Sequence, residues 1–491
     1  MILTAVHLLL RSIGTSFQVY LSGKIGAEGI GLLQLTLSAG TFAMVAGIAG
    51  IRTSTMYLTA EEIGRKQIEN IPWILSGCIR YALITGGAVA LLLTLFAPYI
   101  AEYMIGEVQT VQSLRLYAGF LCVNCLCGVM TGYFTAECRI GALATVEVAE
   151  QLLSMVITIL LLKFWAGTDP GRACESVILG SGAGACMTLL FLTALRLLER
   201  GTCGPPISIR RRLTATAVPL ALADILRSGI ATLENMMVPR RLALANDVQS
   251  PLASFGILTG MVFPVLMFPA CILHALADLL IPELARSAAR EAHERIRYLV
   301  SKCLIISLLY GTFFGGGMYL IAEDLCQRLF SEPEAGTALK RYAILIPMLY
   351  CDALVDAMTK GLGQQKICVR YNITTSAMDI AGQYILLPKY GMDGYFVSFL
   401  VTHLINFLLS LRRLLMITGI TLNRKRGLYT ILSGAACVAL CVHIATPWMR
   451  IALFAVSLYC MLTLFGIHKN NDLAWIKRTL FPKWHKKTTV P

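Results

Sequence analysis

The stretch Tyr81-Ala-Leu-Ile-Thr-Gly-Gly-Ala-Val-Ala-Leu-Leu-Leu-Thr-Leu-Phe-Ala-Pro-Tyr-Ile-Ala101 decides the fold class. It contains no charged side chain, and as a helix it would span about 30 Å, the thickness of the hydrocarbon core of a bilayer. Similar stretches recur along the chain with short connections, and 56% of the 491 residues are hydrophobic. We therefore predict an all-α polytopic membrane protein with about 14 transmembrane helices.

Hydropathy places the spans and divides them into two groups. The predicted spans are 1–21, 31–51, 81–101, 114–135, 146–166, 174–198, 214–236, 252–281, 301–321, 342–361, 371–387, 392–411, 428–446 and 449–468. The predicted domains are an N-lobe (1–198, helices 1–6), a cytoplasmic linker (199–213), a C-lobe (214–412, helices 7–12), a basic loop with helices 13 and 14 (413–468) and a basic tail (469–491). A faint echo between Gly29–Leu35 and Phe255–Gly260 suggests that the lobes are parallel repeats. The two extra helices are expected either to form a lipid-facing groove or only to pack on the bundle.

Basic residues set the expected orientation. Most Lys and Arg lie in every second connection, for example in Arg210–Arg212, Arg286–Lys302 and Arg424–Arg426. The positive-inside rule predicts that these connections and both termini are cytoplasmic, in a bacterial plasma membrane. The net charge of +14 is dispersed along membrane edges, so no nucleic-acid partner is expected. The first span is expected to be uncleaved, because a signal-peptide core would not carry Arg11.

Arginines inside spans are the first candidate site. A charge at the bilayer centre costs at least about 2.5–3.5 kcal/mol, so such residues normally face protein or water. Arg11 has about ten residues of its span on either side, and Arg52 ends the second span. Together with Arg227 and Asp224, they are the predicted substrate site for a phosphate-bearing ligand, which suits the guanidinium fork. The alternatives are a buried ion pair of Arg11 with an acid such as Glu150 or Asp224, and a local pair between Asp224 and Arg227.

Acidic residues give a second candidate site. Glu234 and Asp379, with the neighbouring Asn235 and Asn372, are the predicted cation-coupling residues, for Na⁺ or a proton. Asp352 and Asp356 share a helix face and therefore need a cation, an arginine or water. We expect no bound cofactor and no metal site, because Cys122, Cys125 and Cys127 have no His or acidic partner nearby.

The eighth span contains a predicted gating kink. Pro264 and Pro269 interrupt it, with Gly260 upstream, and each proline removes a backbone donor and clashes with the preceding turn.

An ordered set of motifs carries a family resemblance. It begins with Arg11 and Leu21–Leu35 and continues through Val238–Leu242, Gly256–Pro269 and Leu280–Leu284. Gly361–Lys366 and Leu387–Tyr395 follow in order. The set resembles the stage V sporulation protein B group of the multidrug, oligosaccharidyl-lipid and polysaccharide exporter (MOP) superfamily, over about Arg11 to Gly419.

The resemblance implies a function. The chain would be a two-lobe, alternating-access flippase, and not an enzyme, that moves a polyprenyl-diphosphate-linked precursor of peptidoglycan, cell wall or spore envelope between leaflets. Arg11 and Arg52 would meet the diphosphate, and the last two helices would meet the polyprenyl tail. The expected partners are the bilayer, the lipid-linked sugar and cell-wall synthases, with the protein itself a monomer. Two alternatives are a cation-coupled multidrug antiporter and a non-transporting scaffold for cell-wall synthesis.

Overall fold

The computed structural model describes residues 2–465 except 49, 168, 199–204, 206–208, 246–248 and 422–423. Most of the predicted linker and the whole predicted tail, 469–491, lie outside the described residues. Every regular element within the described ranges is a helix. The helices group into two compact units, which are described here separately.

The first group, the α2–α7 unit, comprises residues 20–244 and 249–256 of the described chain. Its elements are the later part of α1 (Ile2–Ile48), α2 (Ile51–Gly64), η1 (Ile68–Asn70), α3 (Ile71–Tyr99), η2 (Ile100–Ile105), α4 (Thr110–Ala136), α5 (Ile140–Leu161), η3 (Leu162–Ala166), α6 (Pro170–Leu198), α7 (Arg210–Leu242) and α8 (Pro251–Gly256). η2 and η3 are π-helical turns at the ends of α3 and α5.

The second group, the α9–α16 unit, comprises residues 2–19, 245 and 257–465 of the described chain. Its elements are the start of α1, η4 (Ile257–Val262, π-helical), α9 (Phe263–Met267), α10 (Ala270–Ala289), α11 (His293–Phe330), α12 (Pro333–Ala343), α13 (Ile346–Gly361), α14 (Gln365–Thr418), α15 (Arg424–Cys441) and α16 (Pro447–Leu464). Helix α1 therefore contributes to both units. The lobe bounds 1–198 and 214–412 stay a prediction.

The helices are long and apolar enough to cross a bilayer many times. Nine helical stretches of the described chain qualify as spans, and up to 11 if two bent pairs each count as one span. Two of these stretches contain a further break, because Gly26 in α1 (φ 70°, ψ 179°) and Gly391 in α14 (φ 53°, ψ −133°) leave the helical conformation. Their positive φ values are favourable only for glycine. Each of the 14 predicted spans overlaps a helical segment of the structure.

Helix α14 is a tight hairpin. The Ser398 hydroxyl reaches back to Asp379, and Arg413 near the end of the helix donates to Gln364, just before its start. These contacts require the segments before and after Gly391 to run antiparallel. The hairpin thus accounts for two predicted spans, 371–387 and 392–411.

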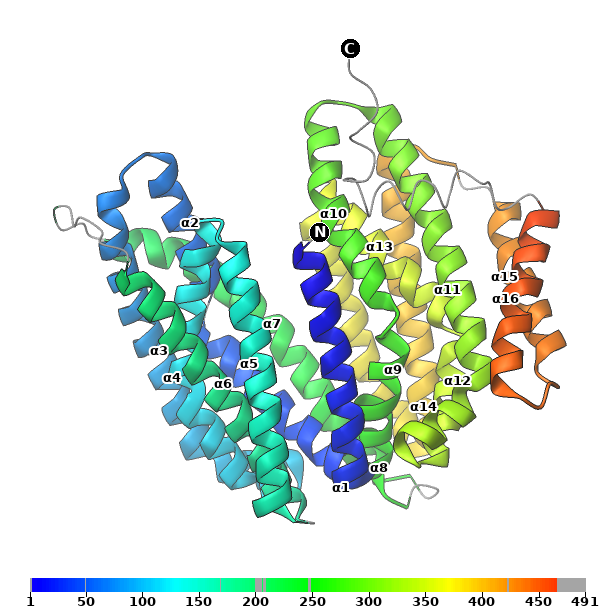
Figure 1. Cartoon of the computed structure of the whole chain (residues 1–491), viewed down its shortest axis with the longest axis horizontal. Helices are drawn as coiled ribbons and strands as arrows, with labels where there is room; N and C mark the ends of the chain where they lie inside the picture. Colours follow the sequence, from blue (N-terminus) through cyan, green and yellow to red (C-terminus); the bar gives the residue numbers. More distant parts are fainter. Residues whose placement is uncertain are drawn as a thin grey trace. The chain divides into compact units, whose positions relative to one another are not determined.

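The last two helices pack on α11. The buried ring of Phe454 in α16 lies against Gly316 and stacks at 6.2 Å on Phe313, both from α11. Arg450 donates to the carbonyl of Leu320 at 3.0 Å. In Figure 1, α15 and α16 lie together beside α11. The lipid groove predicted for this pair stays a prediction.

Close helix approach in the α2–α7 unit depends on small residues, as is common in bilayers. A Cβ atom added at Gly132 of α4 would lie 2.4 Å from the carbonyl oxygen of Arg52 and 3.1 Å from Cβ of Thr55, both on α2. Gly128 of α4 faces the same stretch of α2. The position of the Arg52 backbone is therefore fixed by glycines on the neighbouring helix.

We predict that Gly132→Ala destabilises the protein, because its methyl group has no room against the α2 backbone. Overpacking of this kind costs about 1–3 kcal/mol. Gly119→Ala on the same helix is the matched control, since a Cβ there meets nothing within 4 Å. Thermal unfolding of the two purified variants checks this, and equal melting temperatures would contradict the packing described.

Candidate functional site

Arg11 lies near the start of α1 with an exposed side chain. It interacts electrostatically with Cys271 and His274 of α10 and with Tyr350 of α13. No side chain within the described part of the chain forms an ion pair with it. The suggested partner Glu150 instead accepts a hydrogen bond from Thr188 at 2.6 Å. The Arg11 guanidinium is thus left without a protein anion among the described residues.

Arg52 is exposed on the first turn of α2. In the described ranges its side chain forms neither an ion pair nor a hydrogen bond. The other end of α2 differs, because Glu61 and Glu62 bind Arg212 at 2.8 Å each and Glu61 also binds Arg65. Acidic groups are therefore available in this unit, but at the far end of the helix that carries Arg52.

Asp224 and Arg227 are both exposed on α7. They are three residues apart, yet the described structure contains no ion pair between them. Arg227 therefore keeps its charge available, as Arg52 does in the same unit. Whether Arg52, Arg227 and Asp224 bind substrate stays a prediction.

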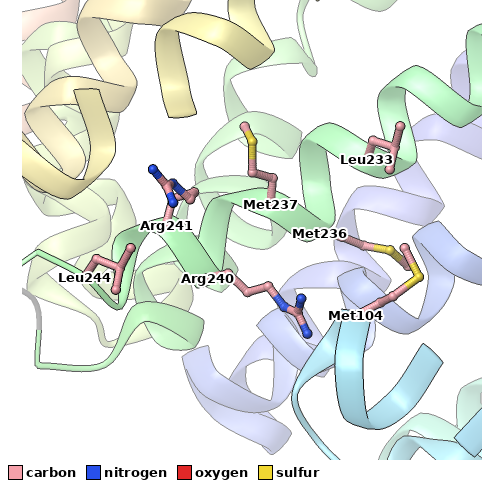
Figure 2. Close-up of a pocket in the computed structure, with 7 residues that line it drawn as sticks. All are labelled: Met104, Leu233, Met236, Met237, Arg240, Arg241 and Leu244. Carbon is pink, nitrogen blue, oxygen red and sulfur yellow. The ribbon is translucent and has the colours of Figure 1, made fainter. Parts of the chain in front are cut away.

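A cavity of about 450 Å³ lies along the end of α7. Figure 2 shows its lining: Met104 from η2, and Leu233, Met236, Met237, Arg240, Arg241 and Leu244 from α7 and the turn after it. The side chains of Arg240 and Arg241 extend in different directions from the helix. Thioether and guanidinium groups that line the same cavity fit an anionic group attached to an apolar chain.

Sequence reasoning used Val238–Leu242 only as a family motif and missed this cavity. The signal available in the sequence was the pair of arginines shortly after two methionines near the end of an apolar span.

The segment with Gly260, Pro264 and Pro269 is a broken helix. Residues Pro251–Met267 and Ala270–Ala289 are bent by 62° relative to each other. The π-helical turn η4 precedes Pro264, and Gly260 lies within it. Side chains from other helices cap three carbonyls here, which belong to Gly260, Leu266 and Pro269. A gating role for these residues stays a prediction.

The α14 hairpin encloses a buried acidic residue. Asp379 is only 3% exposed, and its Oδ1 accepts a hydrogen bond of 2.6 Å from Ser398. Tyr342 of α12 and His403 interact electrostatically with Asp379. The Tyr342 hydroxyl is buried and has no hydrogen-bond partner in the described structure. Asn372 lies on the same face of α14, two helical turns before Asp379.

Asp352 and Asp356 of α13 have different partners. Asp356 forms an ion pair with Lys360 at 2.5 Å. Asp352 accepts a hydrogen bond from Asn406 at 3.2 Å, and its other oxygen, Oδ1, is buried without a partner in the described structure. One carboxylate therefore has the cation that the sequence pattern required, and the other has a neutral amide.

The predicted cation-coupling residues fall in both units. Asn372 and Asp379 belong to the α9–α16 unit, and Glu234 and Asn235 belong to the α2–α7 unit. Asn235 donates to the Ser38 hydroxyl of α1 at 3.1 Å. A search of the described residues finds no group of three or more His, Cys, Asp or Glu arranged to hold a metal ion.

His274 is a candidate that sequence reasoning missed. It lies one turn before Asp278 on α10 and interacts electrostatically with both Asp278 and Arg11. The sequence signal was a His and an Asp four residues apart within an apolar span. Nothing in the sequence indicated that Arg11 would lie near them.

Comparisons with known proteins place this architecture. No protein-family model matches the chain. Stage V sporulation protein B of Bacillus subtilis (strain 168) is 23% identical over 383 residues, covering 74% of this chain and 72% of that protein. Sporulation protein YkvU of the same organism is 21% identical over 279 residues, covering 55% of this chain and 62% of that protein.

Solved structures share the fold. The lipid II flippase MurJ, in an inward closed conformation, aligns with a TM-score of 0.73 at 13% identity, covering 96% of this chain and 100% of that chain. An inward-facing multidrug resistance MATE family transporter of the MOP superfamily aligns with a TM-score of 0.65 at 14% identity, covering 85% and 100%. At this identity the structures show the fold alone.

The described chain therefore has the two-lobe fold of these MOP superfamily structures. Its sequence is similar to that of stage V sporulation protein B. The predicted resemblance to that protein group and the predicted all-α fold of two repeated lobes are both confirmed.

We predict that Ser398→Ala destabilises the protein, because it removes the hydroxyl that donates to the buried carboxylate of Asp379. Leaving a buried acceptor without its donor costs about 1–3 kcal/mol. Thr402→Val is the matched control, since the buried Thr402 hydroxyl bonds only to backbone carbonyls of its own helix. Chemical or thermal unfolding measures both, and a smaller loss for Ser398→Ala than for Thr402→Val would refute the assignment.

Proposed function

We propose that this protein is an alternating-access flippase for an anionic lipid-linked sugar. Its cargo would be a polyprenyl-diphosphate-linked precursor of the cell wall or spore envelope, moved from the inner to the outer leaflet. The observation that carries the proposal is the pair Arg11 and Arg52, which are exposed within apolar spans and have no ion-pair partner among the described residues. The names of the flippase and sporulation proteins that it resembles support the substrate class.

The physical need for such a protein comes from the headgroup. The idealised cost of moving one ion from water into a medium of low dielectric constant is of order 20 kcal/mol, so a diphosphate does not cross unaided. Guanidinium groups in a hydrated passage replace the lost hydration with charge-assisted, bidentate hydrogen bonds. The lipid tail needs no such shelter and remains in the bilayer. Arg227 and the arginines of the α7 cavity extend the basic surface of the α2–α7 unit.

The membrane potential is the proposed main driving force. The cytoplasmic side of a bacterial plasma membrane is electrically negative. Moving the anionic headgroup to the outer leaflet therefore moves negative charge in the favourable direction. This is worth about 2.3 kcal/mol per charge per 100 mV.

Asp379, with Ser398 and Asn372 in the α14 hairpin, is the proposed place where Na⁺ or a proton adds to this drive. Because this buried carboxylate forms no ion pair within the described structure, a bound Na⁺ or a proton is needed to offset its negative charge. Glu234 and Asn235 are proposed as a separate cation-coupling place within the α2–α7 unit.

Neutralising the arginines tests the substrate site. We predict that Arg11→Ala and Arg52→Ala each lower flipping of a fluorescent polyprenyl-diphosphate sugar in proteoliposomes by about tenfold to hundredfold. This is the range for losing a hydrogen bond to a charged group, about 1.5–3 kcal/mol. Arg65→Ala is the control, because Arg65 already pairs with Glu61 at the end of α2.

Three outcomes would count against the proposal. Full activity of both variants would remove the arginine site. Export of cationic dyes without flipping would favour the multidrug antiporter. A cell-wall phenotype that survives both substitutions but not truncation of the basic loops would favour the scaffold.

Collapsing the membrane potential tests the driving force. With valinomycin and equal K⁺ on both sides, while Na⁺ and proton gradients are kept, we predict that outward flipping falls severalfold. The physical reason is the loss of an equilibrium bias of roughly fiftyfold per charge at 100 mV. Initial flipping rates with and without valinomycin measure it, and an unchanged rate would show that an ion gradient supplies the drive instead.

A further inference from the structure

The broken helix changes its hydrogen-bond pattern next to a proline. Gly260 lies in the π-helical turn η4, where the pattern is i→i+5, and the α-helical turn that follows contains Pro264, which has no N–H to donate. The hydrocarbon interior offers no water in its place, and an unsatisfied backbone group there costs several kcal/mol. The structure supplies another donor: Nε2 of Gln18 lies 3.0 Å from the Gly260 oxygen.

The two other capped carbonyls are held from helices of the same unit. Tyr350 of α13 donates to Leu266 at 2.8 Å, and Tyr310 of α11 donates to Pro269 at 2.8 Å. These tyrosines fix the break to the body of the α9–α16 unit. Gln18 differs from them because it comes from α1, the helix that carries Arg11.

Gln18 and Arg11 lie on one face of α1. They are separated by seven residues, about two helical turns. Gln18 binds η4, before the break, while Arg11 interacts with Cys271 and His274 of α10, after it. The first half of α1 therefore lies near both η4 and α10, which are on opposite sides of the break. A hydrogen bond between neutral groups holds the Gln18 end of this contact.

The position of Gln18 along the chain adds to its importance. The chain leaves the α9–α16 unit after Val19, and Gly26, further along α1, departs from helical geometry. Gln18 is thus in the last turn of α1 that belongs to this unit.

We propose that Gln18 is the positioning residue of Arg11: by holding the carbonyl of Gly260, in the π-helical turn before Pro264, it makes the first half of α1 and the broken helix move as one body. A change in the bend angle would then move Arg11 as well. Conversely, binding of an anion to Arg11 would act on the bend angle. This inference goes beyond the proposed function, because it concerns a mechanical link that exists with or without any particular cargo.

A probe distance within one unit tests the link without any ligand. Spin labels carried by non-canonical amino acids at the exposed positions Leu9 of α1 and Leu279 of α10 report the distance between the two helices. In the full-length protein in nanodiscs we expect a narrow distribution, which Gln18→Leu shifts or broadens. Thr15→Val is the matched control, since the exposed Thr15 hydroxyl bonds only to the backbone of Arg11. An unchanged distribution in Gln18→Leu overturns the proposal.

Amide hydrogen exchange gives a second readout of the link. We expect Gln18→Leu to lower amide protection in Ile257–Met267 about tenfold, because the turn loses the donor that holds the Gly260 carbonyl. Thr15→Val should leave the protection there unchanged. Equal protection in Gln18→Leu and in the parent protein would overturn the proposal.

The flipping assay gives a third readout. If the link holds, Gln18→Leu lowers flipping while Thr15→Val does not, and most of the loss due to Arg11→Ala disappears in the Gln18→Leu background. If the two substitutions instead lower flipping independently, so that their fold losses multiply in the double variant, the positioning role is overturned. Absence of flipping in the parent protein would count against the proposed function but would leave the spin-label and exchange results as they are.

Discussion

A hydrocarbon layer offers no hydrogen-bond partner, and this constraint explains most of the features described above. Backbone groups satisfy one another within helices, so only helices cross the layer. Where a proline or a π-helical turn breaks that pattern, a side chain must complete it, as Gln18, Tyr310 and Tyr350 do around the bend in α8–α10. The irregular carbonyls at this bend are thus matched by specific donors on neighbouring helices.

The same constraint sorts the charged residues into two kinds. Some are satisfied within the protein, such as Asp356 by Lys360 and Glu62 by Arg212. Others, such as Arg11 and Arg52, have no protein partner among the described residues and must face water, lipid headgroups or a ligand. Only this second kind can bind a mobile anion without first breaking an ion pair, which is why they carry the proposed function.

The sequence predicted the spans well because hydropathy is a local property that each helix carries by itself. All 14 predicted spans overlap helical segments, including both halves of α14, whose break at Gly391 lies in the four-residue gap predicted between the spans. The partners of charged residues were harder to predict, because spacing along one helix does not determine which side chain forms the ion pair or hydrogen bond. Asp224 and Arg227 are three residues apart but unpaired in the described structure, whereas Asp352 found Asn406, 54 residues away. Nothing in the sequence indicated the hydrogen bond of Gln18, since its partner is a backbone carbonyl 242 residues away.

The chemical type of the tie at Gly260 follows from what it must do. A lysine or arginine at position 18 would hold the carbonyl more strongly, but it would place a second cation near Arg11 and would cost more to bury than an amide. An amide donates without a net charge, so it satisfies the carbonyl without adding a cation at the break. The tyrosine hydroxyls that donate to Leu266 and Pro269 are neutral donors as well. The irregular carbonyls of the broken helix are therefore satisfied without any charged side chain, and the proposed role of Arg11 uses a charge that these hydrogen bonds do not occupy.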